Sequence, residues 1–273
     1  GADPKSISGL QLWLKADAIT GTSDGAALGT WSDSSGNGYD ATQGTAANKP
    51  TFKTNIQNSK PTVRFDGSND ALTLGNNLSF ERTDSFSIFV VANPTSTATN
   101  GGFISKRGAA TAYTGWTFLK SSNNTLGFQL INNYAANNYI QSLTGGTTNI
   151  TGSFRILGMT YAGTSLISGV KLYVNGASEA FTTDIDALSA SIITATAANV
   201  GNINTSDNPL TGDIAEIIVY NKALSTAERQ AIEAYLGNKY NISTGSTVAN
   251  LAEWQDGSST VLGSFTASGS LGV

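Results

Sequence analysis

The sequence predicts an all-β fold, an antiparallel jelly-roll β-sandwich with one short C-terminal helix and a β tail. Two observations carry this prediction. Apolar and β-branched runs of roughly five to eight residues alternate with clusters of Gly, Asn, Ser and Pro, which is typical of antiparallel sandwiches rather than of βαβ units. The 273 residues are 39% hydrophobic with a formal net charge of -4, so the chain is able to build a core.

The clearest strand predictions lie in the middle of the chain. Phe86–Asn93 is an apolar run closed by Pro94, as expected for a central strand. Val170–Val174 leads into Asn175-Gly176, a type I′ turn because both central residues of that turn need a positive φ, and a partner strand follows through Phe181. The other predicted strands are Leu10–Lys15, Thr62–Asp66, Gly102–Lys106, Trp116–Lys120, Leu126–Ile131, Phe154–Tyr161, Ala198–Ile203 and Asp213–Tyr220.

One segment has the signature of a helix. Ser225 and Glu228 form a capping box, in which each side chain satisfies the other residue's backbone N–H. An apolar stripe that should pack on the sandwich follows, and we predict that the helix ends near Gly237 to Asn238. The stripe consists of Ile232, Tyr235, Leu236 and Tyr240.

The composition divides the chain into two parts. Residues 1–242 hold the predicted sandwich, and residues 243–273 form a Ser-, Thr- and Gly-rich linker with a short tail. The tail predicts two or three short strands around Asp256-Gly257 and Ser268-Gly269. Because so few residues bury too little apolar surface to be stable alone, we expect the tail to pack on the sandwich or on copies of itself.

Composition also excludes several functions. The absence of His and Cys removes Ser-His-Asp triads, Cys nucleophiles, thiolate or imidazole zinc sites and disulfides. With 15 Lys and Arg residues, the chain lacks the cationic surface that nucleic acid requires. No apolar run approaches the ~18 residues of a membrane span, and no signal-peptide core opens the chain, so we expect a mature or trimmed protein without membrane insertion.

Several segments occur in an informative order. They are Gly9–Asp17, Trp31–Gly38 with Asp40-Ala41, Pro61–Gly67 with Asp70, and Gly212–Asn221 leading through Ala223–Ser225 into the capped helix. Together they bracket roughly residues 6–242 and resemble the concanavalin A-like, laminin-G-type jelly-roll family. That family includes lectins, adhesion modules, glycan-binding accessory domains and glycosidases, so the resemblance implies a fold more than a function.

The tail carries a second pattern, made of Trp254, Asp256, Gly257, Val261, Leu262, Gly269 and Leu271. This pattern is similar to the short β repeats of phage tail and head fibres. Because such repeats commonly lie at trimer axes, the resemblance implies a homotrimer through residues 251–273. It also implies display on a virion or at the cell surface, as part of a fibre or appendage.

The carboxylates do not show a catalytic pattern. Retaining glycosidases of this fold carry a Glu-x-Asp-x-x-Glu-like strand with the two carboxyls ~5 Å apart, and the sequence has none. Asp213 and Glu216, three apart on a predicted strand, should point to opposite faces. Asp184 and Asp186 share a face or loop, and we interpret them as a solvated turn. The sequence therefore predicts no enzymatic activity.

Calcium is the metal that the available oxygen ligands would suit. The candidate ligands are Asp66 and Asp70, in a turn after a strand, and Asp213, at the start of the closing strand; Asp33 to Asn37 is a further acidic loop. The alternative is that these residues make turns by bonding their own backbone. A structural Ca²⁺ is thus an expectation at these positions.

Glycan binding needs flat aromatic faces together with amide groups on loops. Residues 132–139 repeat Asn-Asn-Tyr, and Tyr113 and Trp116 supply nearby aromatic rings. The alternative is that the tyrosines cover a sheet edge while the amides cap turns. Trp13 and Trp31 are predicted in the core. The predicted ligand-binding residues are Asn132, Asn133, Tyr134, Asn137, Asn138, Tyr139, Tyr113 and Trp116.

These observations favour a non-enzymatic recognition or adhesion module that binds a glycan or a cell-surface receptor. Several weak sites held on one fibre would bind multivalently. Two alternatives stay open: a purely structural virion or surface protein that binds protein partners, and a glycan-active hydrolase or its accessory domain.

Overall fold

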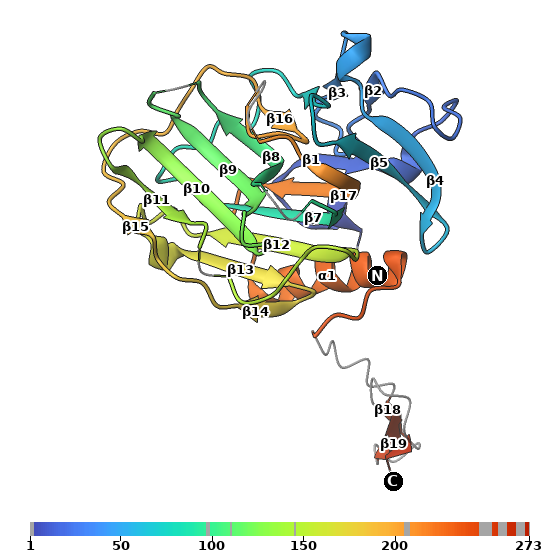
Figure 1. The fold of residues 1–273 in the computed structure, drawn as a ribbon. Coiled ribbons are helices and arrows are strands. Elements are labelled where there is room, and N and C mark those ends of the chain that lie inside the picture. Colours follow the sequence, from blue (N-terminus) through green and yellow to red (C-terminus); the bar gives the residue numbers. More distant parts are fainter. Residues whose placement is uncertain are drawn as a thin grey trace.

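The structure is a computed structural model that describes residues 3–96, 99–109, 111–144, 146–204 and 208–245, and the backbone of three short strands between residues 253 and 272. Up to residue 245, the described chain forms two antiparallel sheets packed face to face, with a helix on the outside (Figure 1). The predicted all-β jelly-roll sandwich is confirmed.

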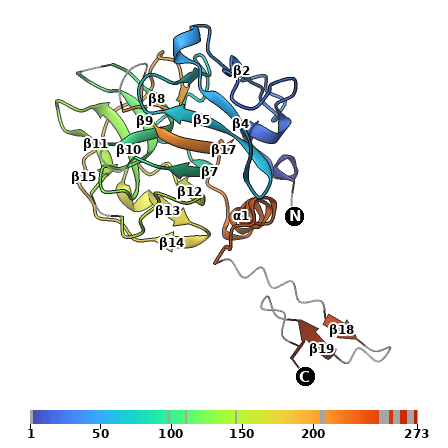
Figure 2. The same ribbon diagram turned by 45° about the vertical axis from the view of Figure 1, so that its right-hand side comes forward.

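The first sheet has the strand order β14-β13-β12-β7-β17-β5-β4, and β1 pairs with the second half of β17. Its position beneath the helix is visible in Figures 1 and 2. Its strands are β1 (Leu10–Lys15), β4 (Thr51–Gln57), β5 (Lys60–Asp66), β7 (Phe86–Pro94), β12 (Arg155–Tyr161), β13 (Val170–Val174), β14 (Ala177–Glu179) and β17 (Thr211–Tyr220).

The second sheet has the order β15-β11-β10-β9-β8-β16-β6-β3-β2. Its strands are β2 (Thr30–Trp31), β3 (Ala41–Thr42), β6 (Leu72–Thr73), β8 (Gly101–Arg107), β9 (Gly115–Lys120), β10 (Leu126–Asn133), β11 (Asn138–Ser142), β15 (Ile185–Asp186) and β16 (Asn199–Val200). Short 3₁₀ helices, η1 (Pro4–Ser6), η2 (Ala16–Ala18), η3 (Ala46–Asn48) and η4 (Ile167–Gly169), lie in the connections.

Strand β7 shows why the predicted central strand is apolar along its whole length. Ile88 and Val90 point into the core between the two sheets, whereas Phe89 and Val91 join the cluster beneath the helix. A strand covered on both faces cannot alternate apolar and polar residues. The two tryptophans predicted in the core, Trp13 and Trp31, are both buried.

Helix α1 (Thr226–Tyr240) begins as predicted, with the capping box of Ser225 and Glu228. The predicted end near Gly237 is wrong, because the helix runs to Tyr240 and stops at Asn241, which has a left-handed φ of 52°. Gly237 is needed for another reason: a Cβ there would lie 2.8 Å from the Ile242 carbonyl oxygen, where the chain folds back over the helix.

The hairpin prediction is confirmed, since Asn175 and Gly176 have φ values of 50° and 79° between β13 and β14. The tail forms a small sheet of β18 (Glu253–Gln255), β19 (Val261–Phe265) and β20 (Leu271–Gly272). Its predicted turns at residues 256–257 and 268–269 lie outside the described residues. Among the residues described, no helix is long and apolar enough to cross a membrane.

Candidate functional site

Three tyrosine rings lie together at the surface of the second sheet. The rings of Tyr134 and Tyr139 stack, with centroids 4.7 Å apart and an interplanar angle of 11°, and Tyr113 meets Tyr134 edge-on at 5.7 Å. Tyr139 is buried in β11, whereas Tyr134 in the β10–β11 turn keeps 38% of its surface exposed. The cluster therefore combines a buried ring, that of Tyr139, with an exposed ring, that of Tyr134, which a ligand is able to reach.

Backbone hydrogen bonds hold the loops that carry these rings. The N–H of Tyr134 donates to the carbonyl oxygen of Ala112 at 2.8 Å, which ties the β10–β11 turn to the β8–β9 loop. Within the turn, the Ala136 N–H donates to the Asn133 side chain, and Asn137 takes a left-handed φ of 54°. Burial and the adjacent Tyr134 raise the pKa of Tyr139, so its hydroxyl remains protonated.

A hollow of about 420 Å³ opens beside Tyr113 and Tyr134. Arg107, the last residue of β8, lies in it with its guanidinium carbon 4.4 Å from the centroid of the Tyr113 ring. Its Nη1 donates to Oε1 of Gln129 at 3.1 Å. The lining residues are Asn100, Arg107, Tyr113, Gln129, Tyr134, Leu143, Ile203 and Asn208.

A chain of side-chain amides fixes the floor of this hollow. Gln129 on β10 and Gln141 on β11 are register partners, and Nε2 of Gln129 donates to Oε1 of Gln141 at 2.7 Å. Gln141 in turn donates to the Asp184 carboxylate at 3.3 Å. Because each amide is held by the next group in the chain, the orientation of the Gln129 side chain is fixed.

The predicted asparagines are mostly used to organise loops. Asn132 donates to the carbonyl oxygen of Ser191, and Asn138 exchanges two hydrogen bonds with Ser189. These contacts attach the segment before β16 to the edge of the sheet. Of the four aromatic residues predicted for the site, Tyr113, Tyr134 and Tyr139 come together, whereas Asn132 and Asn138 make structural contacts.

Trp116 does not lie where a ligand-binding residue must. It is 1% exposed, packs between the sheets, and donates from Nε1 to the Leu78 carbonyl oxygen at 3.0 Å. On β9, Trp116 is the register partner of Leu130, whose side chain is in the core. Trp116 therefore points to the core side of the sheet, opposite to Gln129. The prediction that Trp116 adds an aromatic face to the site is therefore wrong, because its ring is buried.

The acidic residues predicted for calcium have protein partners. Both carboxylate oxygens of Asp213 accept hydrogen bonds from Arg64, at 2.8 and 2.9 Å. Asp70 accepts from the Asp66 N–H, and Asp66 caps its own turn through the Ser68 N–H. In the described part of the chain, no group of three or more acidic residues is placed to hold a metal ion. The calcium expectation stays a prediction from the sequence.

The carboxylates considered for catalysis also have structural contacts. Asp184 accepts from the Leu143 N–H and the Thr144 hydroxyl, and Asp186 from the Ile167 N–H. The expectation that Asp213 and Glu216 face opposite sides of β17 is wrong. An irregularity in the pairing between Ile214 and Glu216 adds a residue, so both carboxylates lie on the outer face.

From the sequence, Arg107 could orient an acidic group or be a plain surface charge, and neither Arg107 nor Gln129 was expected at the tyrosine cluster. Gln129 is the polar residue within an otherwise apolar strand, Leu126–Ile131, and Gln141 has the same place in β11. Polar residues at such positions signal the outer face of a sheet. What no pattern in the chain indicates is that the two strands pair these residues directly.

The chain is similar to known proteins in sequence and in fold. A family model described as the concanavalin A-like lectin/glucanases superfamily matches residues 66–228. The binding domain of Paraclostridial mosquitocidal protein 1 superposes with a TM-score of 0.58 and 16% identity, over 93% of this chain and 55% of its own. A search of curated proteins by sequence found no match.

Two further solved structures share the fold. Domain 4 of AbnA, an extracellular arabinanase from Geobacillus stearothermophilus solved with arabinotriose, has a TM-score of 0.53 and 19% identity over 81% of this chain and 96% of its own. Trypanosoma rangeli sialidase has a TM-score of 0.56 and 14% identity over 87% of this chain. This chain spans 34% of the sialidase, about a third of its length.

At these identities the superpositions show a shared fold and no more. The family model matches more than half of the chain, and its jelly roll agrees with the two sheets described above. On this evidence, the chain belongs to the concanavalin A-like lectin/glucanases superfamily.

Proposed function

We propose that this chain is a non-catalytic carbohydrate-recognition module whose ligand lies on the tyrosine cluster of the second sheet. The observation that carries the proposal is the exposed ring of Tyr134, stacked on Tyr139 beside a polar hollow. A sugar ring presents C–H groups on one face and hydroxyls around its edge. The ring of Tyr134 would pack on the C–H face of the sugar, and the amide and guanidinium groups of the hollow would bond the hydroxyls at its edge.

The mechanism is rigid, shallow recognition. The Tyr134 ring is supported by Tyr139, and Gln129 is oriented by Gln141, so little side-chain entropy is lost when a sugar binds. A shallow site makes few contacts, so single-site affinity is weak, and several copies on one particle would raise it. The binding domain of Paraclostridial mosquitocidal protein 1, and the arabinanase domain solved with arabinotriose, support this proposal by analogy.

The non-catalytic part of the proposal rests on how the carboxylates are used. Asp184 orients a glutamine, Asp186 caps a backbone N–H, and Asp213 pairs with Arg64. Each is held by structural contacts and none lines the hollow beside Tyr134. Incubating the bound glycan with the full chain should therefore release no reducing ends; steady release would overturn this part of the proposal.

The recognition surface is tested with a glycan array and the full chain. Replacing Tyr134 with Ala should weaken binding of the best glycan by roughly tenfold, because ring stacking is worth about 1 kcal/mol or more. Tyr134→Phe keeps the ring and should retain most of the binding. Leu166→Ala, which truncates another exposed apolar side chain away from the tyrosine cluster, is the matched control. An array that stays blank, or a Tyr134→Ala variant that binds normally, would refute the proposal.

We also propose that the tail joins three copies of the chain on a virion fibre or surface appendage. Support comes from the resemblance of residues 251–273 to fibre repeats and from the small sheet of β18, β19 and β20. Light scattering after gel filtration should give three times the chain mass of 28.2 kDa. Trp254→Ser should lower this mass toward one chain, whereas a monomer from the unaltered protein would contradict the trimer.

A further inference from the structure

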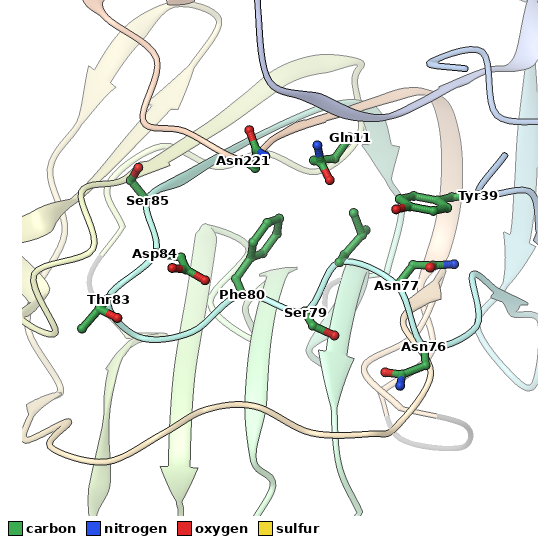
Figure 3. Close-up of a pocket in the computed structure, with 11 residues that line it drawn as sticks. Gln11, Tyr39, Asn76, Asn77, Ser79, Phe80, Thr83, Asp84, Ser85 and Asn221 are labelled. Carbon is green, nitrogen blue, oxygen red and sulfur yellow. The ribbon is translucent and has the colours of Figure 1, made fainter. Parts of the chain in front are cut away.

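A second and larger hollow, of about 650 Å³, lies at one end of the sandwich, away from the tyrosine cluster. Segment 76–85, between β6 and β7, forms one side, while Gln11 of β1, Tyr39 and Asn221 close the other (Figure 3). In Figure 3, the ring of Phe80 extends toward Gln11 and Asn221, Asp84 lies beside Phe80 on the same segment, and the hydroxyl of Tyr39 points into the hollow. Elements far apart in the sequence thus meet around one cavity.

The lining offers hydrogen-bonding groups that the protein itself does not use. In contrast to the loop asparagines described above, these side chains make no hydrogen bond to any residue in the described ranges. They are Tyr39, Ser79, Thr83, Ser85 and Asn221. Asn76 and Asn77 each use one end of the amide, toward Lys106 and the Leu74 carbonyl oxygen. Ser79, Thr83 and Asn221 are exposed, so their hydroxyl and amide groups are free to bond a polar ligand in place of water.

The floor of the hollow is built rigidly and at an energetic cost. Leu78 has a left-handed φ of 56°, which is unfavourable for a leucine. Its carbonyl oxygen accepts from the buried Trp116 indole, and Phe80 stacks on Phe86 with centroids 4.6 Å apart and an angle of 7°. Two core contacts therefore hold segment 76–85 in one conformation, which prepares the hollow for a ligand.

The charge of the hollow selects the class of ligand. Asp84 is the acidic residue among those that line it, and its position is fixed by reciprocal hydrogen bonds with the Glu81 backbone. No Lys or Arg occurs among the lining residues. The nearby ammonium of Lys106 already donates to Asn76 and to the Thr196 carbonyl oxygen. A phosphate, sulfate or uronate group in the hollow would therefore meet the Asp84 carboxylate with no cation among the lining residues, which disfavours anionic ligands.

We propose that this hollow is a second saccharide site, which takes an uncharged sugar unit and rejects acidic sugars. Asp84, Asn221 and Ser85 bond the ring hydroxyls, and the side chains of Phe80 and Tyr39 supply the apolar contact. An apolar ligand fits less well, because most of the lining is polar and uncharged. This site shares no lining residue with the hollow beside the tyrosine cluster. An experiment is therefore able to refute one of the two sites while supporting the other.

The experiment is ¹H–¹⁵N chemical-shift mapping on the full chain, titrated with glucose, galactose, N-acetylglucosamine and glucuronic acid. At least one of the neutral probes should shift the amide signals of residues 76–85 and 221, with a Kd of ~1–10 mM, as expected for one sugar unit in an open site. Glucuronic acid should not. Ser85→Ala combined with Asn221→Ala should weaken that binding roughly tenfold.

Three further variants make the result decisive. Ser178→Ala removes an exposed hydroxyl from β14, outside this hollow, and should change nothing. Tyr134→Ala should leave the shifts at residues 76–85 intact while affecting the other site. Asp84→Asn, which keeps the acceptor for the Glu81 N–H, should admit glucuronic acid. Shifts confined to the tyrosine cluster, or none at residues 76–85 with any neutral probe, would overturn the proposal.

Discussion

Nε1 of Trp13 donates a 2.6 Å hydrogen bond to Oε1 of Glu216, joining β1 to β17 beneath helix α1. Glu216 is 1% exposed, yet its carboxylate also accepts from Tyr235, Tyr240 and Lys239 of the helix. A buried charge is tolerated only where its oxygens are paired in this way. Glu216 is therefore one of the residues that attach the helix to the first sheet, together with the apolar cluster beneath the helix.

Replacing Glu216 with Ala should lower the free energy of unfolding by about 3–5 kcal/mol. The substitution removes the acceptor for a buried indole N–H and leaves Lys239 with Asp17 alone as its ionic partner. Denaturant unfolding monitored by tryptophan fluorescence measures the change. Lys53→Ala, which breaks the surface ion pair with Asp24, should leave the midpoint nearly unchanged. Equal effects from the two variants would contradict this account of Glu216.

Asp70 should make the protein less stable as the pH rises. Burial, and then repulsion by Asp66, raise the pKa of the Asp70 carboxyl to about 6, from a usual value of 3.8. The folded state therefore binds the proton more tightly than the unfolded state, so this contribution to stability is complete below pH 3.8 and is lost as the pH rises to about 6.

Asp70→Asn keeps an acceptor for the Asp66 N–H and removes the buried charge. It should stabilise the protein by about 1 kcal/mol at pH 7 and by nothing measurable at pH 4. Thermal unfolding at both pH values tests this. Destabilisation at pH 7 would show that the carboxylate is needed in its charged form, as a bound cation would require.

Gly201→Ala should be much more damaging than Gly152→Ala. Both glycines have a left-handed φ, of 86° and 79°, so both substitutions pay the backbone cost of roughly 1–2 kcal/mol. A Cβ at Gly201 would also lie 2.1 Å from the Phe65 ring in the core, whereas a Cβ at Gly152 meets nothing within 4 Å. The difference between the unfolding free energies of the two variants therefore measures the clash with Phe65. A difference near zero would show that the Phe65 ring moves aside at little cost.

Asn138→Ala should loosen the segment before β16 without removing a ligand contact. Asn138 exchanges two hydrogen bonds with Ser189. Losing both should cost roughly 1–2 kcal/mol and speed amide hydrogen exchange at residues 187–193. Glycan affinity should change less than in Tyr134→Ala. If the Asn138 variant instead loses binding with unchanged exchange, this asparagine contacts the ligand directly.

Local patterns in the sequence were enough to predict the sandwich, the Asn175-Gly176 hairpin and the start of helix α1. Each of these depends on residues that are close along the chain. The strands show as short apolar runs between turn residues, the hairpin as an Asn-Gly pair that accepts a positive φ, and the helix start as a Ser and a Glu three residues apart. The aromatic part of the candidate site was also readable, because Tyr134 and Tyr139 flank one short turn.

Which side chains lie at the candidate site depends on how the strands pair, and local patterns do not show this. Pairing between β10 and β11 placed Gln129 beside Gln141, the register of β9 turned Trp116 into the core, and an extra residue in β17 put Asp213 and Glu216 on one face. A one-residue change in strand register reverses the face of every side chain that follows. Long-range contacts set that register, so the hollow closed by Gln11, Asp84 and Asn221 is encoded by no local pattern.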